Sequence, residues 1–361
     1  MKHLSIAQPL VGEEEVQAVS AVLRSGMLAA GPVVKKFEEA FAISCGAKHA
    51  IATNNGTSAL HAAFLAAGIG PGDEVIVPTF SFFATASAVS MCGAMPVFAD
   101  VDGQTYNLDP ESAADCITPQ TRAICGVHLF GQPCDVASLR DLCDDRGLLL
   151  IEDAAQAHGA TYFGDTVGSL GDLACFSFYA TKNMLTGEGG MVTTASKKFD
   201  DCVRSLINHG QQEKYLHVRL GYNYRMTDLA AAIGLAQLAK LGAMNAARRK
   251  NASILDRSLK GTALILPVVR PGVNHVYHQY VVRVAAPERD EFMRSLQDRG
   301  ISTAVHYPRC IHEQPYYRSQ GVAATCPVGE QISHEVVSLP VHPGLSDEDM
   351  EYLVSSINEV L

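Results

Sequence analysis

The sequence lacks tryptophan and any CxxC pair, and it has fewer basic than acidic residues. Without a CxxC pair the usual spacing of zinc, iron–sulfur and thioredoxin-like sites is missing, so we predict no metal site. Lys and Arg number 28 against 38 Asp and Glu, which gives a formal net charge of −10. That balance argues against nucleic acid or an anionic membrane as a partner, because both attract clustered basic side chains. We attach no functional meaning to the absent tryptophan.

Long apolar runs are also missing. No stretch reaches the roughly 18 consecutive apolar residues that span a bilayer. The N-terminal stretch MKHLSIAQPLVGEEEVQ lacks the apolar core of a secretion signal. We therefore expect a cytoplasmic protein whose ten cysteines are free thiols that pack as small hydrophobic side chains.

The sequence does contain a regular alternation of short apolar runs and helical periods. Hydrophobic residues make up 47% of the 361 residues and charged residues 18%, which is ordinary globular usage. Several runs are apolar at consecutive positions, as is typical of a parallel sheet covered on both faces. The pattern therefore predicts an α/β fold with a mainly parallel, seven-stranded sheet. Strands are expected at 49–53, 74–78, 95–100, 121–130, 148–153, 174–179 and 190–194, and helices at 12–26, 33–46, 57–70 and 136–147.

The pattern changes after Met226. A long Ala- and Leu-rich helical stretch, 226–261, comes first. We place a domain boundary near residue 240, with a large domain at 1–240 and a smaller C-terminal α+β domain at 241–361. The smaller domain is predicted to contain strands at 278–285 and 302–308 and helices at 288–300 and 346–361. The last helix opens with Ser346 and Asp349, close to a capping box.

Small and polar residues follow the first strand, at the sheet edge where ligands of open α/β sheets bind. Gly56, Thr57 and Ser58 form a strand-to-helix turn whose backbone N–H groups and hydroxyls can hold a phosphate. A plain helix cap is the simpler interpretation of the same residues. Three phenylalanines follow the next strand: Phe80, Phe82 and Phe83. One of these rings could lie flat on a heteroaromatic ligand, but core packing is the better explanation of this motif taken alone.

Two carboxylates, Glu152 and Asp153, end the strand at 148–153. A buried carboxylate needs a positive or proton-donating partner, and the protonated nitrogen of a pyridine ring would serve. Gln156 and His158 follow closely and could meet the same ligand. The simpler interpretation is that the carboxylate lies in a loop and caps the next turn. If a carboxylate does bind a ligand, the sequence does not decide between Glu152 and Asp153.

Ser177 and Lys182 follow the strand at 174–179, ahead of a glycine-rich loop. A lone lysine in a loop is usually a solvated surface charge. Together, however, a phosphate cup, a stacking ring, a carboxylate and a lysine are the parts that a pyridoxal 5'-phosphate (PLP) site requires. The lysine would anchor this cofactor covalently and then shuttle protons.

The sequence resembles the DegT/StrS family of PLP-dependent nucleotide-sugar aminotransferases over essentially its whole length. The resemblance implies the fold type I, aspartate aminotransferase-like architecture. Its most specific segments surround the lysine and the GYNYRMTD stretch. The motifs are NGTSAL at Asn54, PGDEVIVPTFSFFATASAV at Pro71, VHLFGQPCD at Val127, IEDAAQAHGA at Ile151, FSFYATKNMLTGEGGMVTT at Phe176, LGYNYRMTDLAAAIGLAQL at Leu220 and HYPRCIHEQPYY at His306.

The resemblance also implies roles at the matching positions. Lys182 would form the Schiff base, Asp153 would pair with the pyridine nitrogen, and Gln156 would lie near the ring hydroxyl. Phe82 matches the stacking aromatic of the family. The phosphate would be held by Gly56, Thr57, Ser177 and Asn223. Asn223 would reach it from a partner subunit, which implies a homodimer with shared active sites.

For the substrates, the resemblance implies L-glutamate as amino donor and a nucleotide-linked keto-sugar as acceptor, used in two half-reactions through one site. The sugar would lie near the segments 25–32 and 306–317, where Arg309 or His312 could attract the diphosphate. We name as substrate-binding candidates His158, Arg225, His306 and Tyr316.

Several alternatives remain open. Family members that deoxygenate sugars carry a histidine in place of Lys182, so that activity is disfavoured. The loop TKNMLTGEGG resembles enzymes that aminate a 4-keto-6-deoxyhexose more than 3-keto-sugar enzymes, whose loop commonly reads GAYGDGG. A 3-keto-sugar, a keto-cyclitol, and a PLP-binding regulatory protein without turnover are the other interpretations. A desulfurase would need a cysteine in a mobile loop, and a purely structural protein would make every strand-end feature a coincidence.

Overall fold

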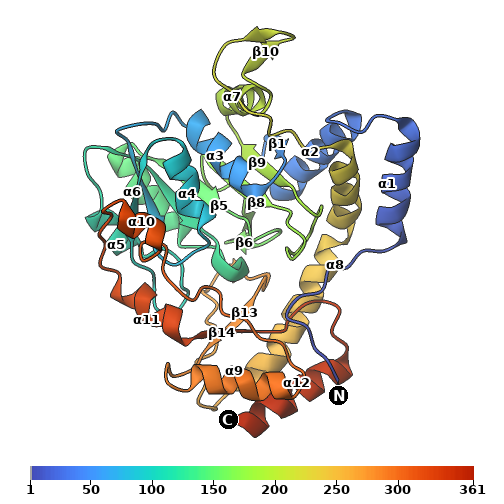
Figure 1. Ribbon diagram of the computed structural model, residues 1–361, viewed down its shortest axis with the longest axis vertical. Coiled ribbons are helices and arrows are strands. Elements are labelled where there is room, and N and C mark those ends of the chain that lie inside the picture. Colours follow the sequence, from blue (N-terminus) through green and yellow to red (C-terminus); the bar gives the residue numbers. More distant parts are fainter. Residues whose placement is uncertain (1) are drawn as a thin grey trace.

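A mixed seven-stranded sheet forms the centre of the larger part of the molecule (Figure 1). The computed structural model describes residues 2–361. The order across the sheet is β1-β9-β8-β5-β4-β2-β3, and β9 runs antiparallel to both of its neighbours while the other pairs are parallel. All seven strands predicted from the apolar runs are present. They are β1 (His49–Thr53), β2 (Glu74–Pro78), β3 (Met95–Ala99), β4 (Thr121–Val127), β5 (Leu149–Asp153), β8 (Leu173–Ser177) and β9 (Gly190–Thr194).

Helices cover both faces of this sheet, which explains the consecutive apolar positions. Ile51 of β1 packs in the core beneath α3, whereas its neighbours Ala50 and Ala52 pack in the core beneath α2. The helices of this part are α1 (Glu13–Ser25), α2 (Pro32–Cys45), α3 (Gly56–Ala66), α4 (Ala84–Met91), α5 (Pro110–Asp115), α6 (Val136–Arg146) and α7 (Lys197–Ile207), with a short 3₁₀ turn at Leu129–Gly131.

Glycines end two of the predicted helices as expected. Gly46 and Gly147 adopt left-handed backbone conformations after α2 and α6, with φ of 70° and 66°. The end predicted for the helix at 57–70 was wrong, because α3 stops at Ala66 rather than at Gly70. Gly68 already has a φ of 83°, which ends the helix a turn earlier.

Short strands complete the larger part. β6 (Thr161–Tyr162), β7 (Asp165–Thr166) and β12 (Val273–Asn274) form a small three-stranded sheet. β10 (Gln211–Glu213) and β11 (Leu216–His217) form a hairpin that projects from the top of the molecule in Figure 1.

The long helix α8 (Asp228–Ser258) connects the two parts of the molecule. Its first half packs Leu241 and Met244 against the large sheet, and its second half packs Ala252 and Leu255 into the C-terminal core. The expected boundary near residue 240 thus falls inside one continuous helix, and we propose that the division lies within it. By length and composition α8 could cross a membrane, but it is placed as a core helix between these two packed clusters.

The C-terminal part is built on two antiparallel strands, β13 (Tyr280–Arg283) and β14 (Val336–Leu339). Leu4 joins this core, so the N-terminal segment packs with the C-terminal part. The strand predicted at 302–308 was wrong, since only the single bridge Ala304–Ser338 forms. The side chains of His306 and Tyr307 hydrogen-bond to Ser338 and Gln156, so this segment leads into a site instead of extending the sheet. The helices are α9 (Arg289–Asp298), α10 (Pro315–Ser319), α11 (Pro327–Glu335) and α12 (Asp347–Val360), the last opened by the expected Ser346–Asp349 capping box.

Candidate active site

The first turn of α3 meets the end of β8, as the phosphate-cup prediction requires. A Cβ on Gly56 would lie 2.7 Å from Cβ of Ser177, so only glycine allows this close approach. The side chain of Asn55 accepts the N–H of Ser58 at 2.8 Å and caps the helix. The first N–H groups of a helix have no partner within it, so those of Gly56 and Thr57 are available to an anion.

The two carboxylates at the end of β5 point to different environments. Glu152 accepts the backbone N–H groups of Gly168, Leu170 and Gly171 at 2.7–3.0 Å and the Nε2–H of His128 at 3.0 Å. Since Nδ1 of His128 accepts the N–H of Cys134, this histidine donates only through Nε2. Glu152 is therefore fully engaged in a structural network, which removes it as a candidate for ligand binding.

Asp153 is buried but keeps acceptor capacity. It accepts the hydroxyl of Thr85 at 2.7 Å and the N–H of Ala155 at 3.2 Å. Burial raises the pKa of this carboxyl, against the lowering effects of Thr85, Ala155 and the charge of Lys182. A further proton-donating partner would therefore stabilise its ionised form.

Lys182 lies partly buried in the loop between β8 and β9. Burial lowers the pKa of its ammonium from 10.5 to about 8, opposed by the charge of Asp153. The loop is closed by a hydrogen bond from Phe178 to Gly189 and another from Thr186 to Phe178. Gly189 has no room for a Cβ against Thr186, which agrees with the tight path that the glycines predicted.

Gln156 and Phe82 lie on the same side of the molecule as the segment around Tyr307. Gln156 accepts the N–H of Phe130 at 2.6 Å and donates to the hydroxyl of Tyr307 at 3.0 Å. The Phe82 ring is 56% exposed and lies 6.0 Å from that of Tyr307. Phe80 is fully buried, so Phe82 is the phenylalanine with a ring free to stack on a ligand.

The charge of Lys182 acts on two imidazole rings, those of His158 and His306. Burial, followed by the charge of Lys182, lowers the pKa of His158 to about 3, and the same two causes lower that of His306. Neither ring nitrogen of His158 has a hydrogen-bond partner among residues 2–361. His306 shares a 2.9 Å hydrogen bond with the hydroxyl of Ser338. The charge of Lys182 acts on both rings, and their role in binding a substrate stays a prediction.

The other predicted residues lie further out. Asn223 is exposed and pairs with Asn208 through the backbone, and Arg225 donates to the Asn208 side chain at 2.7 Å. Tyr316 is 50% exposed, with its ring 6.2 Å from that of Phe83. Among residues 2–361, no hydrogen bond or ion pair within one subunit joins Asn223 to the loop of Lys182.

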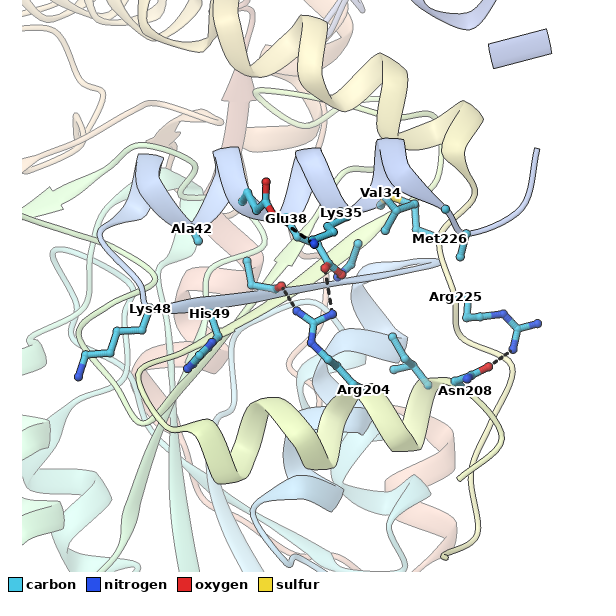
Figure 2. A pocket seen from close by; sticks show the side chains of 16 residues that line it. Val34, Lys35, Glu38, Ala42, Lys48, His49, Arg204, Asn208, Arg225 and Met226 are labelled. Atoms are coloured by element: carbon cyan, nitrogen blue, oxygen red, sulfur yellow. Dashed lines mark hydrogen bonds and ion pairs between the residues drawn. The ribbon is translucent and has the colours of Figure 1, made fainter. Parts of the chain in front are cut away.

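A cavity of about 640 Å³ lies away from Lys182, between α2, β1 and α7 (Figure 2). Among the predicted site residues, only Arg225 lines it. Arg204 extends between the two helices and donates to Glu38 at 2.9 Å and to the carbonyl of Ala50 at 2.9 Å, as Figure 2 shows. Since its charge is compensated by Glu38 and Asp200, Arg204 is not available to an anionic ligand.

Some site residues were missed by the sequence analysis. Thr85 and Tyr307 stood inside quoted motifs, but nothing in their spacing marked them as partners of Asp153 and Gln156. His278 was read as the first residue of a strand, although β13 begins only at Tyr280. Free cysteines were predicted correctly, and among residues 2–361 no cluster of metal-ligating side chains occurs.

Comparisons with known proteins show which family the chain is similar to. The model of the DegT/DnrJ/EryC1/StrS aminotransferase family matches residues 9–358. The chain is 41% identical to a "Pleiotropic regulatory protein" of Geobacillus stearothermophilus, with 99% of this chain and 97% of the relative covered. It is 40% identical to the GDP-perosamine synthase of Caulobacter vibrioides, covering 100% and 99%. A UDP-N-acetyl-3-dehydro-alpha-D-glucosamine 3-aminotransferase of Acidithiobacillus ferrooxidans is 39% identical, covering 97% and 94%.

Solved structures show the same fold. DesV of S. venezuelae, in complex with a ketimine intermediate, matches with a TM-score of 0.93 and 39% identity, covering 96% of this chain and 94% of that one. The structure "Putative sugar aminotransferase Spr1654 from Streptococcus pneumoniae, PMP-form" matches with a TM-score of 0.95 and 28% identity, covering 99% of this chain and 98% of that one. The predicted fold class is thereby confirmed.

Proposed function

Because the chain belongs to the DegT/DnrJ/EryC1/StrS aminotransferase family, we propose that it is a PLP-dependent enzyme that transfers an amino group from L-glutamate to a nucleotide-linked keto-sugar. The observation that supports this most is a partly buried lysine of lowered pKa and a buried aspartate that follow adjacent strands and whose charges act on each other. Both charged groups are costly to bury, and a ligand that bonds to them would offset that cost.

The residues present fit PLP. The cradle formed by Gly56 and Ser177 leaves the N–H groups of the first turn of α3 for a phosphate. Asp153 can accept the N–H of a protonated pyridine ring, and Lys182 can bond covalently to an aldehyde. When bound, PLP supplies an electron sink for the carbon that loses its proton.

Lys182 would carry the proton in each half-reaction. A pKa of about 8 leaves an appreciable neutral fraction near neutral pH, so the amine can accept a proton and the ammonium can return it. The neutral rings of His158 and His306 place no competing positive charge beside it. We propose that these rings, with Tyr316 and Arg225, contact the two substrates in turn.

For the acceptor we favour a 4-keto-6-deoxyhexose linked to a nucleotide. The loop that follows Lys182, with its sequence TGEGG, supports this choice, and so does the similarity to GDP-perosamine synthase. The similarity to a 3-aminotransferase of a UDP-sugar keeps the 3-keto-sugar as the second candidate. A screen of nucleotide 4-keto- and 3-keto-sugars as acceptors would separate the two, and acceptance of a free keto-cyclitol alone would overturn both.

We also propose a cytoplasmic homodimer in which each site is shared. The hairpin of β10 and β11 projects from the subunit (Figure 1), and two exposed apolar side chains lie in it and just after it: Tyr215 is 79% and Leu220 is 80% exposed. Asn223 follows this hairpin and would reach the phosphate held by the partner. The change Leu220→Asp should lower the mass measured by light scattering, with Lys214→Asp in the hairpin turn as a nearby control. An unchanged mass would argue against this interface.

A regulatory protein without turnover is the remaining alternative, since one relative bears a regulatory name. The complete set of Lys182, Asp153 and the Gly56–Ser177 cradle favours catalysis. The deciding experiment is the visible absorption spectrum of the purified protein with PLP, before and after L-glutamate. A band that disappears with glutamate and returns with a keto-sugar supports the enzyme. A band indifferent to every amino donor supports the regulatory protein, and wild-type transamination by Lys182→Ala would reject the assignment of the lysine.

A further inference from the structure

The phenol of Tyr307 meets the larger part of the molecule at Gln156. Nε2 of Gln156 donates to the Tyr307 hydroxyl at 3.0 Å, and 151 positions of the chain separate the two residues. The ring of Tyr307 also lies 6.0 Å from the ring of Phe82, whose exposed fraction is 56%. One tyrosine of the C-terminal part therefore contacts both an amide and an exposed ring of the candidate site.

The direction of the amide hydrogen bond is set by a backbone donor. Oε1 of Gln156 accepts the N–H of Phe130 at 2.6 Å. A backbone N–H can only donate, so the amide oxygen must face Phe130 and the NH₂ group must face Tyr307. The carbonyl of Asp153 accepts the N–H of His128 at 3.0 Å, which ties the turn that contains Phe130 to the end of β5. The amide therefore cannot turn over without losing a buried hydrogen bond.

The hydroxyl hydrogen of Tyr307 is left without an acceptor. The oxygen accepts from Gln156, so its own hydrogen points elsewhere, and no atom of residues 2–361 accepts it. Burial raises the pKa of this phenol, Gln156 lowers it and the charge of Asp153 raises it, so the group stays protonated near neutral pH. Tyr307 is only partly buried, and an oxygen atom of a ligand can satisfy this donor.

A closed circuit of contacts joins this hydroxyl to the residues proposed for the cofactor. The carbonyl of Phe82 accepts the N–H of Thr85 at 3.1 Å, and the hydroxyl of Thr85 donates to Asp153 at 2.7 Å. Gln156 follows Asp153 by three positions and contacts Tyr307, whose ring returns to Phe82. The unsatisfied hydroxyl therefore borders the same site as the buried carboxylate and the exposed ring.

The polar groups of PLP can be assigned to this site by elimination. The first turn of α3 would take the phosphate, Asp153 would take the ring nitrogen and Lys182 would take the aldehyde. The ring hydroxyl is the polar substituent that remains, and the Tyr307 hydroxyl is the donor that remains. Gln156 can add the second hydrogen of its NH₂ group. Donors of this kind suit an ionised oxygen, because a hydrogen bond to a charged acceptor is the stronger one.

We infer that Tyr307 is a further cofactor-binding residue, whose hydroxyl donates a hydrogen bond to the ring oxygen of PLP and favours the ionised form of that oxygen. The inference deepens the proposed function and rests on it, because it takes PLP as the ligand. An oxygen of the amino donor or of the keto-sugar is the competing acceptor.

Binding of PLP and of its 3-deoxy analogue, which lacks the ring hydroxyl, tests the contact. Both compounds are titrated into cofactor-free wild type and Tyr307→Phe, and binding is followed by absorbance. Tyr307→Phe should bind PLP roughly tenfold more weakly, as expected when a hydrogen bond to a charged group is lost, and should bind the analogue as wild type does. Equal losses for the two compounds would show a structural role, and no loss for either would also overturn the inference.

The pH dependence of the bound cofactor gives a second measure. The absorbance of bound PLP across pH reports the protonation of its ring. Tyr307→Phe removes a donor that favours the ionised oxygen, so the midpoint should rise by about one pH unit, which corresponds to a tenfold change. An unchanged midpoint would overturn the inference, and a raised KM for glutamate or for the keto-sugar would then assign the hydroxyl to that substrate.

Tyr352→Phe, in α12, is the matched control. It removes a tyrosine hydroxyl that donates to the carbonyl of Arg299 at 2.7 Å, and it should change neither the affinity nor the midpoint. Thermal unfolding of Tyr307→Phe should confirm that the variant folds, since its ring is retained beside Phe82. A wild type that binds neither PLP nor the analogue would reject the proposed function as well. A wild type that binds PLP, without any difference between the two compounds in Tyr307→Phe, would reject this inference alone.

Discussion

The hydroxyl of Thr85 donates a 2.7 Å hydrogen bond to Oδ2 of Asp153. This contact joins the first turn of α4 to the end of β5, two elements far apart in the sequence. Burial raises the pKa of Asp153, and the Thr85 bond is the first of the effects that lower it. The hydroxyl therefore helps to keep a carboxylate ionised in a place where ionisation is costly.

Replacing Thr85 by Val should weaken binding of PLP. The change removes one hydrogen bond to a charged group at nearly constant volume, so we expect roughly a tenfold loss of affinity. Titration of the cofactor-free protein with PLP, followed by absorbance, measures it. Thr85→Ser keeps the hydroxyl and should bind nearly as tightly as wild type. Equal affinities for the Val and Ser variants would show that the bond does not matter to the cofactor.

The two neighbouring carboxylates should separate stability from function. Each oxygen of Glu152 accepts two of the four donors, so Glu152→Gln turns an NH₂ group toward two of them and should cost about 3–5 kcal/mol of unfolding free energy, as breaking a buried network does. Asp153→Asn removes a costly buried charge and should leave the cofactor-free protein at least as stable, but without turnover. Urea unfolding and transamination assays on both variants check this. A stable Glu152→Gln or an active Asp153→Asn would reverse the assignments.

Lys182 should make the stability of the cofactor-free protein depend on pH. Its pKa is about 8 in the folded state and 10.5 when exposed, so the unfolded chain binds more protons between these values. The cost of the buried ammonium is complete below pH 8 and is relieved as the pH rises to 10.5. Lys182→Met should therefore be more stable than wild type by up to about 3 kcal/mol at pH 7.

This advantage should shrink steadily above pH 8. Denaturant unfolding at pH 7, 9 and 10 measures it, and Lys198→Met, at an exposed lysine of α7, is the control that should show no such trend. A constant difference across this range would mean that Lys182 is not desolvated in the folded protein.

Two glycines of α8 should respond to alanine in opposite ways. Gly242 is exposed and has no atom within 4 Å of an added Cβ, so Gly242→Ala should stabilise the protein by up to about 1 kcal/mol through helix propensity. At Gly234 the Cβ would lie 2.7 Å from the ring of Phe37, and Gly234→Ala should destabilise by about 1–3 kcal/mol. Thermal unfolding of both variants measures the difference. A stabilising Gly234→Ala would show that α2 and α8 can move apart.

The sequence by itself determined the seven strands of the large sheet and several of the helices, and it supplied the cofactor candidates, because these depend on local signals. Apolar runs, glycine caps and the order of strand ends are all read within a few residues of one another. The residues that complete the site could not be found in this way. Thr85, Tyr307 and His278 reach Asp153, Gln156 and Asn183 across 68, 151 and 95 positions of the chain, and no local pattern reports such contacts.

Tertiary structure also decided between residues that the sequence could not separate. Glu152 and Asp153 are adjacent carboxylates, and a strand sends consecutive side chains to opposite faces of the sheet. The face of Glu152 is filled by backbone donors of residues 168–171, and the face of Asp153 meets the charge of Lys182. The sequence supplied the chemical groups. Burial and neighbouring charges exist only in the folded chain, and they determine which carboxylate can meet a ligand and how readily Lys182 loses its proton.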